Sequence, residues 1–138
     1  MKPIRAVADT NILVSAIFWE GNESKVIHLV EEGKLRLYIS PKLLKELKDV
    51  LSYEKFGLDK KEIEESIEYI LTFTEVILPK RRVNLIQEDP PDNRVLECAL
   101  QCRANYIISG NHHLLQLKEF KKIKIVDAGE LVKELGEA

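Results

Sequence analysis

Apolar residues in this chain fall into short, nearly continuous runs that alternate with stretches of helical period. Runs of four or five largely apolar residues predict strands that are buried on both faces, as in parallel sheets. Five runs meet this description: 4–8, 35–39, 75–78, 106–109 and 123–126. The stretches between and after them predict helices at 12–18, 23–32, 41–51, 59–71, 93–103 and 113–117, and a last helix from 127 onwards.

Capping residues support these boundaries. Ser40-Pro41 places an N-cap and a helix-compatible proline at the start of the third helix. Asp59 with Glu62, and Asp127 with Glu130, have the spacing of a capping box. Strands that alternate with helices predict an α/β fold, and a chain of 138 residues is expected to form a single domain over its whole length. We expect a short parallel sheet of about four or five strands with helices on both faces.

The composition is that of a soluble globular protein, with 45% hydrophobic and 32% charged residues. No stretch approaches the ~20 apolar residues that a membrane span requires, and the first strand begins close to Met1 without a signal peptide. We therefore expect a cytoplasmic protein without a membrane contact. Cys98 and Cys102 are expected to be reduced and largely buried. The net charge of −2 argues against a tight, non-specific grip on nucleic acid.

Polar residues stand where predicted strands end or predicted helices begin. Asp9 follows the first strand, Asp92 opens a helix after two prolines, and Asn111 follows Ser109-Gly110 at the end of the fourth strand. In an open parallel sheet, ligands bind outside the carboxyl ends of the strands, so residues far apart in the sequence can share one pocket. Carboxylates in one pocket repel one another unless they share a proton or a cation. The pattern therefore favours a divalent-metal site and a metal-dependent enzyme.

Each of these positions also has a plain structural explanation. Asp9 or Asn11 could cap the helix that follows, and Asp92 could cap its own helix. Asn111 could simply serve a turn. Glu46 lies at the border of an apolar helix face, where it could be solvated or could pair with a lysine one turn earlier. A charge at the head of a buried strand is costly without a partner, so a functional role is favoured at Asp9, whereas Asn11 is expected to hold its neighbours in place.

Two basic clusters and one aromatic pair have no assigned role. The clusters are Lys80-Arg81-Arg82 and the lysines of 118–124. Each could be a solvated face or a rim that contacts phosphates around an acidic pocket. Phe18-Trp19, at the end of the first helix, could form an apolar interface or the edge of the core. Asp89 competes with Asp92 for a place in the acidic pocket and ranks below it, because it precedes the rigid proline pair.

Four motifs in order carry a family resemblance. They are Asp9-Thr10-Asn11 after the first strand, Glu46 on the third helix, Pro91-Asp92-Asn93-Arg94 opening a helix, and Ser109-Gly110-Asn111-His112-His113-Leu114-Leu115. In order and spacing they resemble PIN domains, and more narrowly the prokaryotic PIN proteins classed as toxins of toxin–antitoxin systems. The resemblance runs from about Ile4 to Leu135. It implies a three-layer α/β/α sandwich and a ribonuclease that depends on Mg²⁺ or Mn²⁺.

The resemblance also assigns roles to residues. Asp9, Glu46 and Asp92 match the family's acidic metal-binding positions, and Ser109 matches a small hydroxyl residue that commonly precedes a last acid. Here that last acid is replaced by Asn111, where the family usually has Ser/Thr-Gly-Asp. Mg²⁺ prefers anionic oxygen ligands, so the missing charge is expected to weaken metal binding. The expected partners are the RNA substrate, a small antitoxin that covers the acidic pocket, and a second copy of the chain.

The favoured hypothesis is a PIN-domain endoribonuclease in which Asp9 and Asp92 hold the ion, directly or through water. Glu46 would complete the shell or orient the attacking water, and Asn111 would bind a metal-bound water or ligate weakly. The alternative is a PIN fold that binds RNA or a protein but cuts poorly, because Asn111 replaces a carboxylate. A phosphoacceptor signalling domain is disfavoured, because Asp9 has no adjacent acid and Leu78 is followed by Pro79-Lys80.

Overall fold

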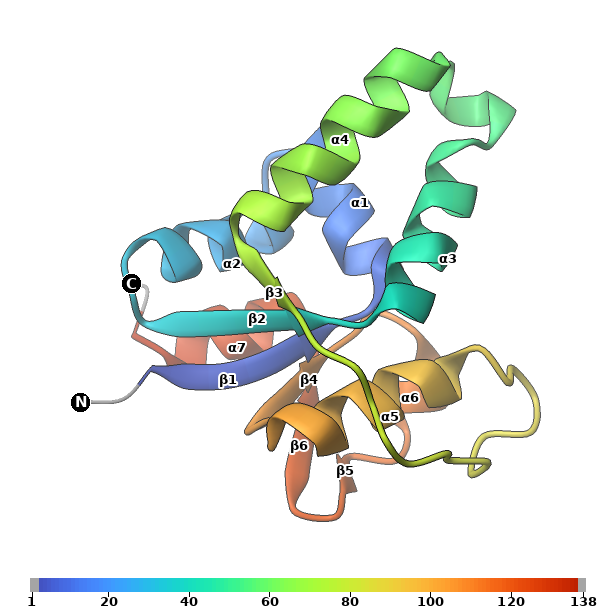
Figure 1. Ribbon diagram of the computed structural model, residues 1–138. Helices are drawn as coiled ribbons and strands as arrows, with labels where there is room; N and C mark the ends of the chain where they lie inside the picture. Colours follow the sequence, from blue (N-terminus) through green and yellow to red (C-terminus); the bar gives the residue numbers. More distant parts are fainter. Residues whose placement is uncertain (1–2, 137–138) are drawn as a thin grey trace.

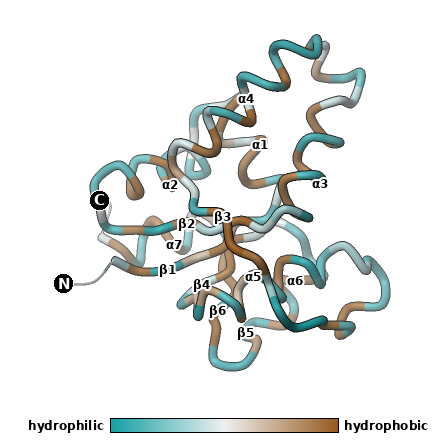
Figure 2. Tube along the Cα trace, in the orientation of Figure 1, coloured by the Kyte–Doolittle hydropathy of each residue, from teal (hydrophilic) through white to brown (hydrophobic). Residues whose placement is uncertain are grey.

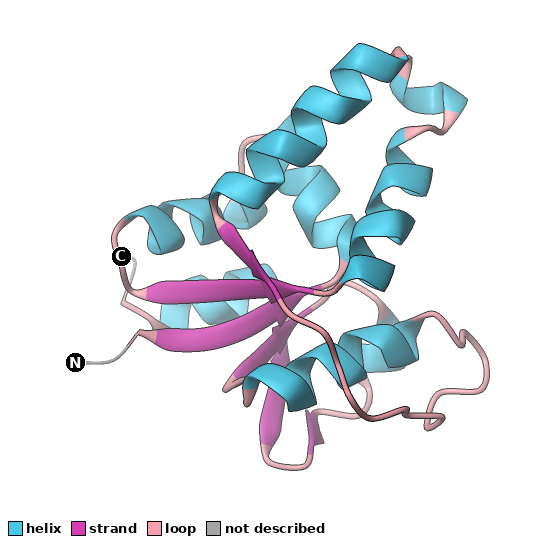
Figure 3. Ribbon diagram, in the orientation of Figure 1, coloured by secondary structure: helices cyan, strands magenta, loops and turns pink. Residues whose placement is uncertain are grey.

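The computed structural model describes residues 3–136 and shows a twisted sheet between two layers of helices (Figures 1 and 3). The strands are β1 (Ile4–Ala8), β2 (Leu35–Ile39), β3 (Thr74–Val76), β4 (Tyr106–Ile108), β5 (Glu119–Phe120) and β6 (Ile123–Val126). The helices are α1 (Thr10–Phe18), α2 (Asn22–Glu31), α3 (Pro41–Leu51), the 3₁₀ turn η1 (Glu54–Phe56), α4 (Lys60–Thr72), α5 (Asp92–Cys102), α6 (His112–Leu115) and α7 (Ala128–Glu134). The expected α/β fold is confirmed.

The order of the strands places a switch point in the middle of the sheet. The order is β3-β2-β1-β4-β6-β5, and every neighbouring pair is parallel except β5 with β6. The chain passes from β1 to β2 on one side, while β4 lies on the other side of β1, with Ala6 opposite Tyr106. The backbone N–H of Asp9 still donates to the carbonyl of Ile108 at 3.0 Å. Such a switch point is where open α/β sheets bind ligands, and here it brings Asp9 beside Ser109.

The sheet differs from the expectation at both edges. It has six strands rather than four or five, because β5 adds a two-residue antiparallel edge through a turn in which Lys121 and Lys122 have positive φ. So short a strand has no apolar run that could predict it. The third strand is Thr74–Val76 rather than 75–78, because the chain leaves the sheet early. Ile77 still donates to the carbonyl of Ile39 at 2.9 Å, but Leu78 is 72% exposed.

The expected helix caps are confirmed. Ser40 accepts a hydrogen bond from the N–H of Leu43 at the start of α3. Asp59 and Glu62 form the capping box of α4, and Asp127 and Glu130 form that of α7. Helix ends agree with the expected ones within a few residues. At 13 residues α4 is the longest helix, and no helix within residues 3–136 is long and apolar enough to cross a membrane.

Helices cover both faces of the sheet. On one face α5 packs against β1, β2 and β4, and on the other α2 packs against α1 and α7 (Figure 1). Ala6 and Val7 point to opposite faces and are both fully buried, as a central parallel strand requires. Cys98 is buried on α5, and Cys102 is partly buried near its end; both are free thiols. Burial raises the pKa of both thiols, that of Cys102 to about 11, so both stay protonated at neutral pH.

An arm formed by α3, η1 and α4 projects away from the sheet (Figure 1). Apolar and polar residues alternate along α4 at helical period, and Ile70 on its apolar side is fully buried (Figure 2). At the tip of the arm, Phe56 stacks on Phe18 with ring centroids 5.3 Å apart. Trp19 meets the edge of Phe18 at 5.9 Å and is 59% exposed. The aromatic pair therefore joins α1 to the arm and leaves one large ring at the surface.

A segment without regular structure, residues 77–91, connects β3 to α5 and is called the strap below. Side chains of α5 hold it in place. Glu97, which is buried, accepts a hydrogen bond from the N–H of Val83 at 2.8 Å. The side-chain amide of Asn93 bonds both the N–H and the carbonyl of Ile86, each at 2.8 Å. These contacts fix the strap against α5 although it forms no strand.

Candidate functional site

Asp9 lies at the head of the site, where β1 ends and α1 begins. Its side chain is 6% exposed, and one carboxylate oxygen accepts from the N–H of Ile12 at 3.1 Å, which caps α1. The other oxygen accepts a hydrogen bond from the hydroxyl of Ser109 at the end of β4. Burial raises the pKa of Asp9, while bonds from Ser109, Ile12 and the backbone of Gly110 lower it. The capping role that the sequence left open is therefore confirmed, and the same side chain also bonds the end of β4, while its functional role stays a prediction.

Asp92 is the first residue of α5, and its side chain is buried. Pro91 occupies the N-cap position, so Asp92 does not cap its own helix. Burial, the charge of Asp89 and the charges of Asp9 and Glu46 raise its pKa to about 6, and His113 lowers it. Because a charge acts strongly only at short range in a protein, this dependence places the acids of β1, α3 and α5 in one neighbourhood. Asp9, Glu46 and Asp92 therefore lie near one another, and their shared role in one site stays a prediction.

Glu46 enters the same neighbourhood from the middle of α3. One carboxylate oxygen accepts from the hydroxyl of Thr10 at 3.3 Å. Burial raises the pKa of this half-buried carboxyl, the bond from Thr10 lowers it, and the charges of Asp9 and Asp89 raise it further. Since α1 and α3 pack against each other, the hydrogen bond with Thr10 holds the half-buried carboxylate of Glu46 next to the start of α1.

Asn111 closes the site from the start of α6. Its side-chain nitrogen donates to both carboxylate oxygens of Asp92, at 3.1 and 3.3 Å. Its side-chain oxygen accepts from the N–H of His113 at 2.8 Å and so caps α6. Its own N–H donates to the hydroxyl of Ser109 at 2.9 Å. In this arrangement Asn111 presents N–H donors to an acid, whereas an aspartate in its place would present a second charge.

The remaining predicted residues lie further from the pocket. The side chain of Asn11 is exposed, and it is its backbone N–H that contributes to Asp9. The basic cluster Lys80-Arg81-Arg82 lies on the strap and is exposed. Across the described residues, no three His, Cys, Asp or Glu side chains are close enough to enclose a metal ion. The acids share a neighbourhood but do not close on a single point.

Sequence reasoning gave too little weight to two residues. The charge of Asp89 raises the pKa of Asp92 more than the charge of Asp9 does, and it also raises the pKa of Glu46. The carbonyl of Asp89 accepts from the N–H of Asp92 at 3.0 Å, so the two prolines between them form a tight turn. The sequence indicated this through the two prolines, which make the chain between Asp89 and Asp92 rigid. Thr10, which holds Glu46, had no signal beyond its place next to Asp9.

The electrostatics of the pocket favour a cation. Asp9, Glu46, Asp89 and Asp92 are four carboxylates whose mutual repulsion is only partly offset by donors from Ser109, Thr10 and Asn111. A hard divalent ion with oxygen ligands would relieve that repulsion. The donor set therefore fits Mg²⁺ or Mn²⁺ in chemical type.

Comparison with known proteins agrees with this architecture. Residues 5–113 match the family model described as PIN domain. The chain is similar to the uncharacterized protein MJ1680 of Methanocaldococcus jannaschii, with 29% identity over 123 residues, 86% of this chain and 78% of that protein. It is also similar to a chain in the crystal structure of VapBC2 from Rickettsia felis bound to a DNA fragment from their promoter. That match has 17% identity and a TM-score of 0.64, and it covers 88% of this chain and 97% of the other; it supports the fold.

Proposed function

The chain belongs to the PIN domain family, and from this premise we propose that it is a divalent-metal-dependent endoribonuclease and the toxin of a toxin–antitoxin pair. Membership of the family supports nuclease activity, while the metal dependence and the preference for RNA belong to the proposal. One observation carries the finer proposal. Asp9, Glu46 and Asp92 come from three different elements to the switch point of the sheet, and each has a raised pKa that a bound cation would relieve.

Asp9 and Asp92 are the proposed ligands of Mg²⁺ or Mn²⁺, either directly or through water. Mg²⁺ keeps several waters and needs only one or two protein carboxylates, so a site in which three acids do not close on one point remains suitable. Once bound, the ion supplies a water of lowered pKa and neutralises charge that develops on the phosphate. Glu46 is the proposed residue that completes the site or orients the attacking water.

Neighbouring residues hold these acids in position. Ser109 and the first turn of α1 fix both oxygens of Asp9, so its carboxylate cannot turn freely. Thr10 restrains Glu46, and Asn111 restrains Asp92. Preorganised ligands of this kind lower the cost of assembling the reactive geometry. In this proposal Asn111 acts as a positioning residue, while a direct contact with metal-bound water stays a prediction.

The proposal is tested by incubating purified protein with RNA and Mn²⁺, beside Asp9→Asn and an EDTA control. We expect cleavage by the parent and a loss of at least about a hundredfold in Asp9→Asn, the scale of removing a key electrostatic group. Asn can still cap α1, so the fold should persist by circular dichroism. Glu68→Gln, which changes an exposed acid on α4, is the matched control and should cut normally. Full activity in Asp9→Asn would remove Asp9 from the mechanism.

A second candidate function is supported by Asn111. If the missing carboxylate disables catalysis, the protein is a PIN fold that binds RNA or a protein without cutting. The same assay with Asn111→Asp separates the two. Cleavage only after Asn111→Asp would mean an intact scaffold that is disabled at one position, and cleavage by the parent would reject this second function.

The proposed partners are an antitoxin and a second copy of the chain. The similar chain belongs to VapBC2 of Rickettsia felis bound to a DNA fragment from their promoter, and by analogy the partner of this chain would be a small antitoxin that covers the acidic pocket. Such a partner should reduce both Mn²⁺ binding and cleavage, because it competes for the same carboxylates. Cleavage that is unchanged when a co-purified partner is bound would reject this part of the proposal.

A further inference from the structure

The carboxylate of Asp92 has a neutral donor in front of it. The side-chain nitrogen of Asn111 lies 3.1 and 3.3 Å from its two oxygens. Because these distances are nearly equal, the nitrogen faces both oxygens at once rather than one of them. A cation that binds a carboxylate through both oxygens must approach from this same side. We call this side the chelating edge of Asp92, and the amide of Asn111 occupies it.

The orientation of the Asn111 amide is fixed by its other contacts. The side-chain oxygen accepts from the N–H of His113 at 2.8 Å. If the amide were turned over, its oxygen would face the carboxylate and its NH₂ group would face that N–H, so both contacts would be repulsive. The N–H of Asn111 also donates to the hydroxyl of Ser109 at 2.9 Å. The amide therefore cannot turn away from Asp92 without breaking the cap of α6.

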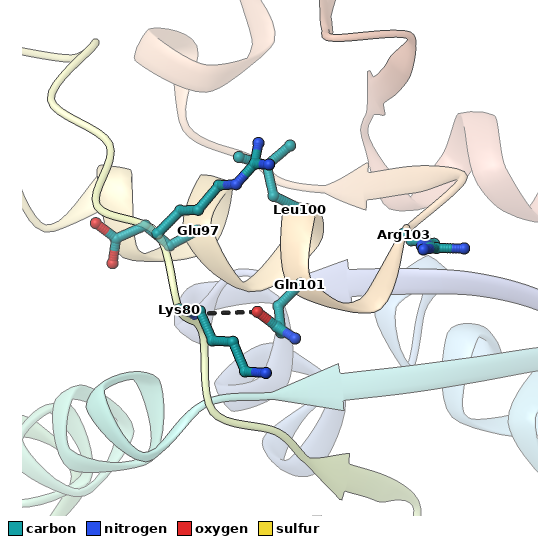
Figure 4. Close-up of a pocket in the computed structure, with 6 residues that line it drawn as sticks. Lys80, Glu97, Leu100, Gln101 and Arg103 are labelled. Carbon is teal, nitrogen blue, oxygen red and sulfur yellow. Dashed lines mark hydrogen bonds between the residues drawn. The ribbon is translucent and has the colours of Figure 1, made fainter.

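The other buried acid of α5 is neutralised within the chain. Glu97, whose side chain lies beside the strap (Figure 4), accepts from the guanidinium of Arg94 at 2.8 Å and from the N–H of Val83. Within residues 3–136, Asp92 by contrast takes part in no ion pair. A buried carboxylate without a cationic partner is costly. The neutral amide of Asn111 meets only part of this demand, so the position stays attractive to a cation.

Divalent ions differ in how they use a carboxylate. Ca²⁺ gathers roughly six to eight oxygen ligands and can take both oxygens of one carboxylate, whereas Mg²⁺ keeps several waters and needs one or two carboxylates. Across the part of the chain that the structure describes, no three His, Cys, Asp or Glu side chains are close enough to enclose an ion. An ion that requires many protein oxygens would therefore depend here on two-oxygen binding by single carboxylates.

We propose that Asn111 determines which cation the site accepts. Its amide blocks the chelating edge of Asp92, so Ca²⁺ is disfavoured, while Mg²⁺ or Mn²⁺ can use one oxygen or a bridging water. The proposal rests on the proposed function, because it takes Asp92 as a ligand of the ion. Asn111 acts through Asp92 and is a positioning residue. The exchange of an aspartate for asparagine then adds selectivity among ions besides removing a charge.

The test measures the affinity of the metal-free protein for Ca²⁺ and for Mn²⁺ by isothermal titration calorimetry. In Asn111→Ser, the affinity for Ca²⁺ should rise about tenfold relative to that for Mn²⁺, the scale of one hydrogen bond to a charged group. Serine is as good an N-cap as asparagine, and its side chain ends one bond short of the amide nitrogen. The variant therefore keeps the cap of α6 and frees the chelating edge. A general loss of structure would instead lower both affinities.

Three further variants locate the effect. Asn11→Ser makes the same exchange at an exposed asparagine of α1 and is the matched control, in which neither affinity should change. In Asn111→Ser/Asp92→Asn the gain for Ca²⁺ should vanish, because the chelating carboxylate is gone. Asn111→Asp adds a charge and should strengthen the binding of both ions. If the missing charge were the whole effect of Asn111, the equally neutral Asn111→Ser would behave like the parent.

The outcomes are distinct from those of the nuclease assay. No gain in Ca²⁺ affinity in Asn111→Ser, an equal gain for Mn²⁺, or the same gain in Asn11→Ser would overturn the role of Asn111 in ion selection, even if the parent cuts RNA. A gain that persists without the Asp92 carboxylate would overturn it as well. A gain for Ca²⁺ that depends on Asp92 would support it, even if no variant cuts RNA.

Discussion

At the scale of single residues, the site consists of carboxyl groups whose charged form is disfavoured by burial. The pKa of Asp92 is raised to about 6 because the side chain is buried and because other carboxylates lie near it, with Asp89 contributing the largest effect of these charges. Asn111 offsets part of this with two N–H contacts to its carboxylate. A group held in this way is often functional rather than structural.

The raised pKa of Asp92 has a consequence for stability. A carboxyl whose pKa is higher in the folded state contributes stability at low pH, and that contribution is lost as pH rises from the unfolded value of 3.8 to the folded value of about 6. We expect metal-free Asp92→Asn to gain stability relative to the parent across this interval, because it cannot ionise. Thermal unfolding from about pH 4 to pH 7 measures the difference, and added Mn²⁺ should restore the parent. A difference that is the same at every pH would contradict the assigned pKa.

At the scale of elements, α5 organises both the site and its surroundings. Its first residue is Asp92, and its buried polar face, Asn93 and Glu97, holds the strap in place. Arg94 adds a bond from its guanidinium to the carbonyl of Val83 at 3.1 Å. The strap therefore owes its path to side chains of one helix rather than to a sheet.

We expect Glu97→Ala to lower the free energy of unfolding by about 3 kcal/mol, because it leaves the Arg94 charge and the N–H of Val83 without their buried acceptor. Urea denaturation measures this loss, and hydrogen exchange should show faster exchange at Val83. Glu68→Ala, on the exposed face of α4, is the control and should change stability by less than about 0.5 kcal/mol. A loss no larger than that of the control would mean that the strap is held by other contacts.

At the scale of the whole molecule, the arm of α3, η1 and α4 stands away from the sheet, and an exposed aromatic ring lies beside it at the end of α1. Trp19 is 59% exposed beside Phe18, which stacks on Phe56 of the arm. A rigid aromatic surface of this kind is common at protein interfaces. None of these three rings lines the hollows beside the basic residues of the strap, so a dimer there would leave those residues exposed.

If this surface forms the proposed homodimer, Trp19→Glu should weaken self-association by roughly thirtyfold, the ~2 kcal/mol of an interface hot spot. Sedimentation over a range of protein concentrations measures the dissociation constant. Tyr69→Glu, which changes another exposed aromatic residue on α4, serves as the control and should leave it unchanged. A parent that stays monomeric at every concentration, or a Trp19→Glu variant that dimerises normally, would reject this interface.

The amino-acid sequence alone is enough to predict the α/β class, the parallel direction of most strands, the helix caps and the places of Asp9, Asp92 and Ser109 next to the ends of strands or helices. These features are encoded locally, by apolar runs of strand length, by caps of fixed spacing and by polar residues just past strand ends. The family motifs added Glu46, for which helical spacing alone was ambiguous. The resemblance to PIN domains is confirmed by the match over residues 5–113.

Features that depend on neighbours distant in sequence become visible only in the folded chain. The fold placed the charge of Asp89 where it raises the pKa of Asp92, and it turned the amide of Asn111 toward Asp92. It also set one of the two basic clusters, Lys80-Arg81-Arg82, in the lining of a hollow beside the start of α3. It also added the short edge strand β5, which pairs through backbone groups and not through an apolar pattern. Electrostatic interaction and burial depend on distance in space, and a single sequence records distance only along the chain.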